Sequence, residues 1–278
     1  MNPVVSAEWL VNQLDNPQIA IADCRFQLAN PQWGRNQYQE SHILGAYYLD
    51  LNLDLSAPVG QSMRGTHGGR HPLPDSASFA AKMAQMGVEW GETWVIAYDD
   101  SAMGFAARLW WLLRYFGHEQ VAILDGGWSG WLNQSYPVTA DCPPPQTGTF
   151  IPQAQSHWVV DYQTVLTRKD QPTVTLIDSR DGDRYRGERE PIDPQAGHIP
   201  GAVNIPWREV CTADGHIRPL AEQQQRWQTI GTEQEIIVYC GSGVTACVNL
   251  LSLELAGIPN AKLYVGGWSD WCSYHLSA

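Results

Sequence analysis

The most informative motif of this 278-residue chain is Ile236-Ile-Val-Tyr-Cys-Gly-Ser-Gly-Val-Thr-Ala246. Residues 236–239 are apolar or aromatic and mostly β-branched, which predicts a buried strand. A helical run follows from Ala246 to Ala256 and stops at Gly257. Cys240 lies in the turn between them, where the free N–H groups at the start of a helix favour a thiolate. The local pattern is consistent with either a reactive thiol or a buried structural cysteine.

The motifs around this turn occur twice, in the same order and at nearly constant separation. Such an internal repeat indicates duplication and is settled before any other interpretation of the fold. In the second copy the four motifs are residues 174–180, 197–202, 236–256 and 263–271, and in the first copy their counterparts are residues 19–25, 41–46, 94–116 and 123–131.

The repeat provides an internal comparison for Cys240. When the two copies are aligned on strand and helix, Tyr98 matches Tyr239 and Asp99 matches Cys240. A position with a purely structural role would be expected to carry similar residues in both copies. The difference between a carboxylate and a thiol therefore favours a catalytic Cys240 in the second copy.

Each copy alternates short buried strands with helices, which predicts an α/β fold with a mostly parallel sheet flanked by helices on both faces. Ligands of such sheets bind outside the carboxyl ends of the strands, where Cys240 falls. Residues 140–155 contain Pro143-Pro-Pro145 and little periodicity, so they are predicted to form an exposed linker. We therefore expect an N-terminal domain over residues 1–139 and a C-terminal domain over residues 156–278.

Composition describes a folded protein with few classes of partner. Hydrophobic residues make up 44% of the chain, the formal net charge is -12, and no run of Lys or Arg stands out. This charge argues against nucleic acid and anionic membranes as partners. No stretch is long enough to span a membrane, and residues 1–14 lack a basic, apolar leader. The six cysteines are scattered and form no CxxC pair, so we expect reduced thiols and a cytoplasmic location.

Taken together, these motifs resemble the rhodanese (sulfurtransferase) family in its two-domain form. The resemblance covers essentially the whole chain. It rests on the Cys240–Thr245 loop, on Gly197-His-Ile-Pro-Gly-Ala202, on the two Gly-Gly-Trp-Ser motifs and on a first copy that lacks the cysteine. It implies an inactive N-terminal domain, a catalytic C-terminal domain, an active site at their interface and a cysteine persulfide intermediate on Cys240.

The resemblance also bears on the sulfur donor. A Cys-Gly-Ser/Thr-Gly-Val-Thr loop is typical of mercaptopyruvate sulfurtransferases, whereas thiosulfate-preferring members more often place basic residues after the cysteine. Residues 241–243 offer backbone N–H donors and no cation, so the loop favours the monoanionic keto-thiol over the thiosulfate dianion. Members that use mercaptopyruvate often carry an arginine within Glu-Pro-Arg, but this chain has Glu190-Pro-Ile192 there, and Arg189 does not align.

The remaining site residues follow from the same resemblance. Arg184 matches the substrate-binding arginine and would hold the anionic group of the donor. His71, in a glycine-rich loop with Arg64, His67 and Arg70, matches a histidine proposed to relay protons with Ser242. An acidic third member belongs upstream of it, at a place where both Asn52 and Asp54 align, so its identity is left open. We also assign substrate contacts to the loop residues Gly241, Gly243, Val244 and Thr245, although Thr245 is also expected to cap the helix or to bond within the loop.

Other residues of the repeated motifs and loops receive structural interpretations. His198 is expected to support its turn, and the equivalent positions of Trp128 and Trp268 mark both as structural. His67 and His216 have no partners at metal-ligand spacing, so no metal and no other cofactor is assigned.

Three other functions are alternatives to sulfur transfer from mercaptopyruvate. A cysteine phosphatase requires Cys-x5-Arg, and the required position holds Ala246, which argues against phosphate chemistry. A thiosulfate sulfurtransferase and a persulfide carrier without donor specificity remain alternatives, since both need the same cysteine loop. The expected partners are a small anionic sulfur donor and an acceptor such as cyanide, a small thiol or a thioredoxin-like protein.

Overall fold

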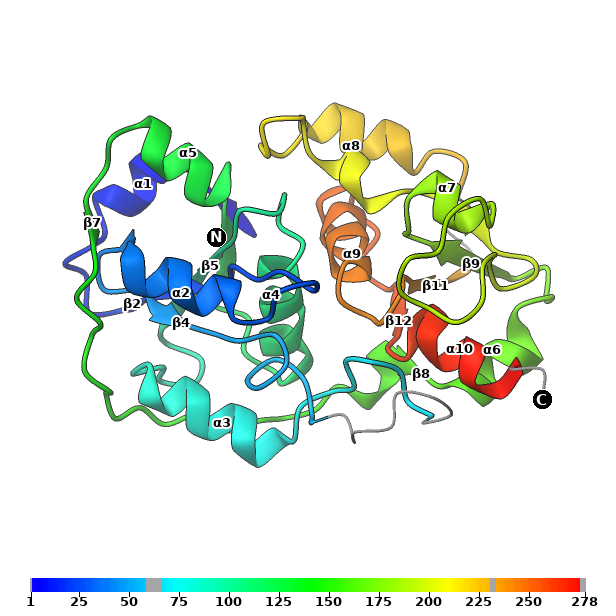
Figure 1. Cartoon of the computed structure of the whole chain (residues 1–278), viewed down its shortest axis with the longest axis horizontal. Helices are drawn as coiled ribbons and strands as arrows, with labels where there is room; N and C mark the ends of the chain where they lie inside the picture. The colour runs from blue at the N-terminus through cyan, green and yellow to red at the C-terminus, as the bar shows by residue number, and fades with distance from the viewer. Residues whose placement is uncertain (1, 59–66, 231–233, 276–278) are drawn as a thin grey trace. The chain divides into compact units, whose positions relative to one another are not determined.

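The computed structural model describes residues 2–58, 67–230 and 234–275, and these form two compact units (Figure 1). The first unit comprises Met1–Ala57, Pro74–Gln155 and Cys211–Ile217, and the second comprises Pro58–Leu73, Ser156–Val210 and Arg218–Ala278. Each unit therefore includes a short segment from the other half of the chain. The domain limits expected from the sequence, 1–139 and 156–278, remain a prediction.

The first unit is built on a five-stranded sheet with the order β1-β6-β5-β2-β4, in which all neighbouring strands are parallel. The short strands β3 and β7 pair antiparallel beside it. Its elements are β1 (Val4–Val5), α1 (Ala7–Val11), β2 (Ile19–Asp23), α2 (Trp33–Glu40), β3 (His42–Ile43), β4 (Tyr47–Tyr48), α3 (Ser76–Gln85), β5 (Trp94–Tyr98), α4 (Ala106–Tyr115), β6 (Val121–Leu124), α5 (Gly127–Asn133) and β7 (Val138–Thr139).

The second unit repeats this plan with the order β10-β9-β11-β12-β8, again parallel throughout. The central strands β9 and β11 correspond to β2 and β5 of the first unit, and helices α9 and α10 correspond to α4 and α5 (Figure 1). Its elements are the 3₁₀ helix η1 (Ser156–Trp158), β8 (Val159–Val160), α6 (Tyr162–Arg168), β9 (Val174–Asp178), α7 (Gly182–Tyr185), β10 (Val203–Asn204), the 3₁₀ helix η2 (Trp207–Val210), α8 (Leu220–Arg226), β11 (Glu235–Tyr239), α9 (Ala246–Leu255), β12 (Lys262–Tyr264) and α10 (Gly267–His275).

The predicted α/β class with two tandem parallel sheets is confirmed, because the buried β-branched and apolar runs form the central strands. Helix α1 has Ser6 as its N-cap, whose side chain accepts a hydrogen bond from the Trp9 N–H at 3.1 Å. The alternating stretch from Tyr47 to Leu55 forms a strand only at Tyr47–Tyr48, and the rest is turn, partly held by hydrogen bonds to the Asp50 carboxylate.

A buried ion pair marks the corresponding place in each sheet. In the first unit Arg25 pairs with Asp23, and in the second unit Arg180 pairs with Asp178, each at 2.6 Å. Each arginine also donates to a carbonyl oxygen of the following turn, that of Ser41 at 2.7 Å or that of Gly197 at 2.6 Å. The duplication read from the sequence thus extends to tertiary contacts.

The same arginines explain the paired tryptophans. The Arg25 guanidinium lies over the ring of Trp128 at 4.2 Å, and the Arg180 guanidinium lies over the ring of Trp268 at 4.8 Å. These cation–π contacts place an aromatic ring over each buried charge. Both tryptophans are buried within their own unit, in agreement with the structural role that we expected.

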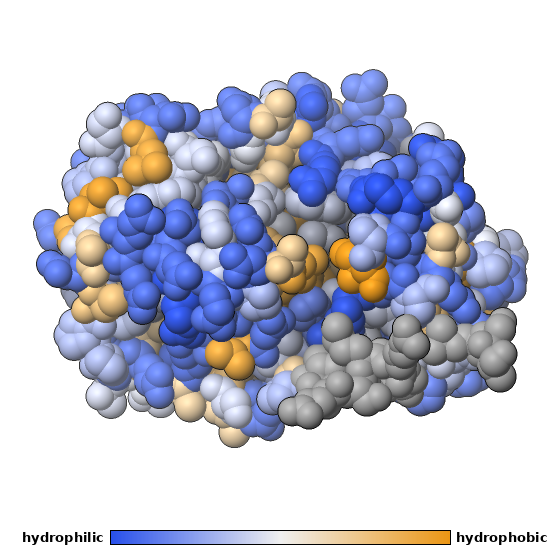
Figure 2. Space-filling view, in the orientation of Figure 1, coloured by the Kyte–Doolittle hydropathy of each residue, from blue (hydrophilic) through white to orange (hydrophobic). Residues whose placement is uncertain are grey.

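The segment 140–155 is mostly exposed but follows the first unit closely. Gln146 and Gly148 donate to carbonyls of α3, and Gln153 and Gln155 donate to Phe116 and Tyr115, all at 2.8–2.9 Å. Hydrophilic residues dominate the face shown in Figure 2, and apolar ones are few and scattered. Among the described residues, no helix combines the length and apolar character that a membrane span requires.

Candidate active site

Cys240 lies where the sequence predicted it, in the turn between β11 and α9 of the second unit. Cys240 is 2% exposed, and Gly241, Gly243 and Val244 are buried beside it. Gly243 adopts a φ of 72°, and a Cβ atom there would collide with the carbonyl oxygen of Val265. Glycine at this position therefore allows the turn to close tightly over the end of the sheet.

The Gly266-Gly267-Trp268 motif fixes the backbone of this turn through hydrogen bonds. The Trp268 N–H donates to the Cys240 carbonyl at 2.8 Å, and the Ser269 N–H donates to that of Gly241 at 2.9 Å. A Cβ atom at Gly267 would lie 2.6 Å from the Cys240 carbonyl oxygen. The start of α10 thus fixes the backbone of the cysteine loop, which explains the glycines of the motif.

The segment 67–71, from the first half of the chain, packs against α10 in the second unit. The Gly68 N–H donates to the Asp270 carboxylate at 2.6 Å, and the Arg70 N–H donates to the Ser269 hydroxyl at 3.2 Å. The ring of His67 stacks on Tyr274 at 3.8 Å. These contacts carry Arg70 and His71 to the same helix end that holds the cysteine loop. The part of the glycine-rich loop that contains Arg64 lies outside the described residues.

His71 and Ser242 are brought together by this arrangement. His71 Nδ1 and Ser242 Oγ are joined by a hydrogen bond of 2.7 Å, and both residues are 5% exposed. A buried hydroxyl bound to an imidazole two residues after a thiol is a chemically suitable proton relay. Of the two residues that align with the acidic member of the relay, Asp54 lies in the first unit, where it accepts from the Asp50 N–H at 2.7 Å and pairs with Lys82 at 3.3 Å.

Arg184 stands beside the cysteine loop, held by two carboxylates. Its guanidinium forms a two-point contact with Glu190, at 2.6 and 3.2 Å, and also contacts Asp193 at 3.2 Å. A Cβ atom on Gly241 would be 3.8 Å from the nearest Arg184 nitrogen. The position suits an anion-binding residue that faces the turn, and contact with a sulfur donor remains a prediction for Arg184.

Arg70 is a residue of this site that the sequence did not single out. Its Nη1 forms an ion pair with Asp193, and its Nη2 lies 2.9 Å from where a Gly241 Cβ would be. Burial lowers the pKa of Arg70 to about 10, with a further contribution from the nearby charge of Arg184, so the guanidinium is still cationic at neutral pH. The loop itself has no cation, but the fold supplies two beside it.

The equivalent turn in the first unit shows what its backbone can hold. The Asp99 carboxylate accepts hydrogen bonds from four backbone N–H groups, those of Ser101, Met103, Phe105 and Ala106, at 2.8–3.1 Å. Its carbonyl also accepts from the Trp128 N–H at 2.8 Å, as that of Cys240 does from Trp268. The pKa of Asp99 is raised by burial, and the hydrogen bonds from these N–H groups reduce that rise. A turn of this kind can therefore surround an anionic group with N–H donors.

Other residues considered from the sequence lie apart from the turn or play structural parts. Arg189 is half-exposed and pairs with Asp183 at 2.6 Å. His198 Nδ1 bonds the Tyr185 carbonyl at 2.8 Å, and its ring stacks on that tyrosine. In the first unit, His216 contacts Asp125 at 3.2 Å. Within the described residues no group of three or more His, Cys, Asp or Glu side chains could hold a metal ion.

The capping role suggested for Thr245 was wrong. Thr245 occupies the N-cap position of α9, but its side chain makes no capping hydrogen bond. The reason is its backbone conformation, with φ -71° and ψ -15°, because a capping side chain requires an extended backbone to reach back to the helix N–H groups.

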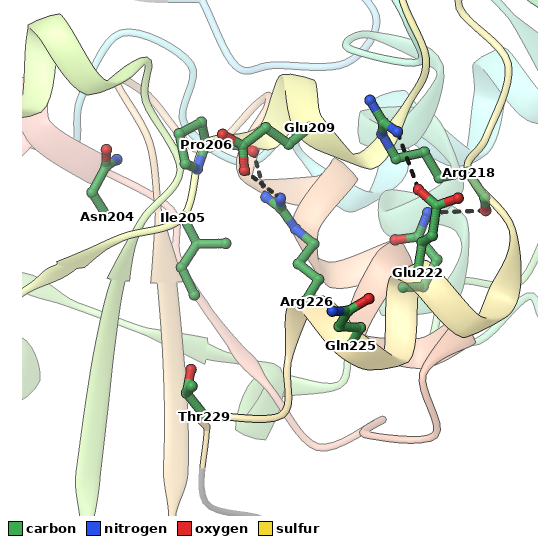
Figure 3. Close-up of a pocket in the computed structure, with 10 residues that line it drawn as sticks. Asn204, Ile205, Pro206, Glu209, Arg218, Glu222, Gln225, Arg226 and Thr229 are labelled. Atoms are coloured by element: carbon green, nitrogen blue, oxygen red, sulfur yellow. Dashed lines mark hydrogen bonds and ion pairs between the residues drawn. The ribbon is translucent and has the colours of Figure 1, made fainter.

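A cavity of about 600 Å³ lies elsewhere on the second unit, between η2 and α8 (Figure 3). Its two arginines are engaged, Arg226 with Glu209 at 2.8 Å and Arg218 with Glu222 at 3.1 Å. Arg226 also contacts the Asn249 side chain at 3.1 Å, so it ties α8 to α9. No cysteine or histidine occurs among its described lining residues. The Cys240 turn is therefore the better candidate for an active site.

Comparison with known proteins identifies the family of the chain. The profile of the rhodanese-like domain matches residues 6–134 and 161–274, so the chain belongs to the rhodanese-like domain family. A probable 3-mercaptopyruvate sulfurtransferase of Pseudomonas aeruginosa is 41% identical over 272 residues, which are 96% of this chain and 94% of the relative. A thiosulfate sulfurtransferase of Rattus norvegicus is 30% identical over 281 residues, with 96% and 91% of the two chains covered.

Solved structures agree in fold. The Escherichia coli protein described as a 3-mercaptopyruvate sulfotransferase with the rhodanese fold superimposes with a TM-score of 0.83 at 33% identity, over 96% of this chain and 99% of its own. A 3-mercaptopyruvate sulfurtransferase from Leishmania major gives a TM-score of 0.81 at 27% identity, over 98% of this chain and 74% of its own. Family membership and the two-copy fold expected from the sequence are thus confirmed.

Proposed function

We propose that this chain is a sulfurtransferase that moves a sulfur atom from 3-mercaptopyruvate to a thiol or cyanide acceptor through a persulfide on Cys240. The observation that carries the choice of donor is the hydrogen bond of 2.7 Å between His71 and Ser242, in the same turn as the thiol. Relatives named for mercaptopyruvate and for thiosulfate both match the chain over most of its length. The chemistry of the leaving group distinguishes the two donors.

In the first half-reaction the Cys240 thiolate attacks the thiol sulfur of mercaptopyruvate, and the carbon–sulfur bond breaks. The bonding electrons leave on the carbon as the enolate of pyruvate, which must be protonated. The Ser242 hydroxyl, backed by His71, is placed to deliver that proton. Thiosulfate would instead release sulfite, a stable anion that needs no acid. A buried proton relay is therefore useful for mercaptopyruvate and unnecessary for thiosulfate.

In the second half-reaction the acceptor attacks the outer sulfur of the persulfide, and the Cys240 thiolate is regenerated. Splitting the transfer into two steps gives each a lower barrier than direct transfer. Arg184 would hold the donor carboxylate during the first step, and the N–H groups of the turn would stabilise the anionic sulfur species, as the Asp99 turn does for a carboxylate. Small thiols and a thioredoxin-like protein are the proposed acceptors, and a cytoplasmic location is proposed with them.

The test compares kcat/KM for mercaptopyruvate and thiosulfate with one acceptor, in the wild type and in Cys240→Ser. We expect a clear preference for mercaptopyruvate in the wild type and no transfer from either donor in the variant. Mass spectrometry after donor addition alone should show one added sulfur on Cys240. A preference for thiosulfate would replace the proposed donor, and turnover by the serine variant would contradict the persulfide route. A persulfide carrier would gain sulfur only from a partner protein.

A further inference from the structure

Asp270 is a buried carboxylate of the second unit to which the proposed reaction gives no part. It lies in the first turn of α10 and is 4% exposed. Its Oδ2 accepts a hydrogen bond from the Tyr264 hydroxyl at 2.7 Å, and its Oδ1 accepts one from the Gly68 N–H at 2.6 Å. A buried carboxylate needs such donors in place of water. One donor comes from β12, and the other comes from a segment about 200 positions earlier in the chain.

The duplication shows that the fold itself does not require this carboxylate. When the two Gly-Gly-Trp-Ser motifs are aligned, Asp270 matches Gly130 and Tyr264 matches Leu124. The first copy thus lacks both members of the pair, although its helix α5 begins at the equivalent glycine of the motif. The carboxylate therefore serves something particular to the second unit, and its contact there is with segment 67–71.

Segment 67–71 approaches the start of α10 most closely at Gly69. This residue has a φ of 80°, and a Cβ atom on it would lie 2.4 Å from the carbonyl oxygen of Gly266. Gly68 also has a positive φ, of 102°, but no atom lies within 4 Å of its Cβ position. The two backbones are therefore in contact at Gly69, and the hydrogen bond from Gly68 to Asp270 fixes the segment beside this contact.

His71 is the side chain whose place depends on this attachment. It follows Gly68 by three positions, and its Nδ1 is joined to Ser242 Oγ by a hydrogen bond of 2.7 Å. Between them, the Arg70 N–H donates to the neutral Ser269 hydroxyl at 3.2 Å. A bond to a carboxylate is roughly twice as strong as one between neutral groups. Of these two backbone attachments, the one to Asp270 is therefore the stronger.

We propose that Asp270 is a positioning residue for the proton relay, which fixes segment 67–71 so that the His71 imidazole meets the Ser242 hydroxyl. Asp270 acts through the backbone of that segment and has no direct part in the proton transfer. The effect on catalysis rests on the proposed function, since only an enolate leaving group needs the relay. The effect on the position of the imidazole does not. The proposal also explains why the carboxylate occurs in the copy that has the cysteine.

Nitrogen NMR of protein labelled at histidine measures the state of the imidazole without any sulfur transfer. The Nδ1 resonance of His71, assigned with His71→Gln, depends on its hydrogen bond, and Ser242→Ala gives its value when that bond is absent. In Asp270→Ala we expect the resonance to move toward the Ser242→Ala value. The Gly68 amide should exchange with solvent about tenfold faster, because a charge-assisted hydrogen bond is lost. A wild-type resonance in Asp270→Ala would overturn the proposal.

Tyr264→Phe is the matched control, because it removes the other partner of the same carboxylate and leaves the Gly68 bond in place. Its His71 resonance should stay at the wild-type value. Asp270→Asn keeps one oxygen as an acceptor without the charge, so its resonance should fall between those of the wild type and Asp270→Ala. An equal displacement in Tyr264→Phe would contradict the proposal, since Asp270 would then act only through the packing of the unit.

Loss of a buried carboxylate can impair folding, so a second pair of variants disturbs the same contact from the segment. Gly68→Ala and Gly69→Ala both place a Cβ atom on a backbone with positive φ, but only the one at position 69 meets Gly266. The His71 resonance should therefore shift in Gly69→Ala and stay nearly unchanged in Gly68→Ala. A wild-type resonance in Gly69→Ala, or an equal shift in Gly68→Ala, would also overturn the proposal.

Steady-state kinetics tests the consequence for catalysis. Asp270→Ala should lower kcat with mercaptopyruvate about tenfold and kcat with thiosulfate less than about twofold, with KM for both donors unchanged. Equal losses of kcat with the two donors would contradict a role in proton delivery. A wild type that transfers no sulfur from mercaptopyruvate would refute the proposed function alone, because the histidine resonances would still decide whether Asp270 positions His71.

Discussion

At the residue scale, the site consists of one thiol and side chains that reach it from distant parts of the chain. Ser242 is fixed by its position in the turn, and its hydroxyl meets His71 at 2.7 Å across 171 positions of sequence. Both side chains are buried, so bulk water cannot easily replace them as a proton source. Their contribution should depend on whether the leaving group needs a proton.

Ser242→Ala tests this dependence. We expect kcat with mercaptopyruvate to fall about 10²-fold, the usual effect of losing general acid catalysis, and kcat with thiosulfate to change less than about twofold. Steady-state rates with the same acceptor would measure both. Equal losses with the two donors would mean that Ser242 supports the loop and not proton transfer.

At the scale of elements, the start of α10 positions the cysteine loop and the segment 67–71 together. Gly267 has a φ of 59° and no space for a side chain, because the Cys240 carbonyl oxygen would lie 2.6 Å from its Cβ. Gly257, after α9, has a φ of 86° and no atom within 4 Å of its Cβ position. A residue with a Cβ atom would be strained at either position, and the two positions differ in the space around that Cβ atom.

Gly267→Ala and Gly257→Ala form a matched pair for this reason. Both variants bear about 1 kcal/mol of strain from a left-handed backbone. Gly267→Ala should lose about 1–3 kcal/mol more through overpacking and should also lose activity, because the loop must shift. Denaturant unfolding and sulfur-transfer rates would measure the two effects. Comparable activity in both variants would mean that the loop does not rely on this contact.

At the scale of the whole molecule, the two units share a plan and differ in chemistry. Each sheet contains a buried Asp–Arg pair with a tryptophan over the guanidinium, Arg25 with Asp23 and Arg180 with Asp178. The second pair is connected to the candidate active site, since Arg180 also contacts Glu190 at 3.3 Å and Glu190 holds Arg184. The first unit thus contains the same buried ion pair and tryptophan, but its turn holds Asp99 where the second unit has Cys240.

Arg25→Met and Arg180→Met should therefore have similar effects on stability and different effects on activity. Each leaves a buried carboxylate without its partner, which typically costs about 3–5 kcal/mol. Under conditions where both variants remain folded, Arg180→Met should in addition raise KM for the donor, because Glu190 loses a contact and Arg184 is less well held. An equal change in KM in Arg25→Met would contradict the separation of roles.

The sequence by itself determined the duplication, the strand and helix runs, the cysteine turn and the family, because these depend on local periodicity and on motifs whose spacing survives in one dimension. It also placed Arg184 and His71 among the site residues, through the resemblance. It misjudged Thr245, since a capping role depends on a backbone angle that composition does not report.

Only the tertiary structure decided which distant residues share the site. Arg70 was one of several basic residues in a glycine-rich loop, and its approach to Gly241 depends on hydrogen bonds to α10 made about 200 positions later in the chain. Asp193 and Glu190 likewise acquire meaning only from the arginines that they hold. The physical reason is that long-range pairing is set by the packing of elements, which leaves no periodic trace in the sequence of a loop.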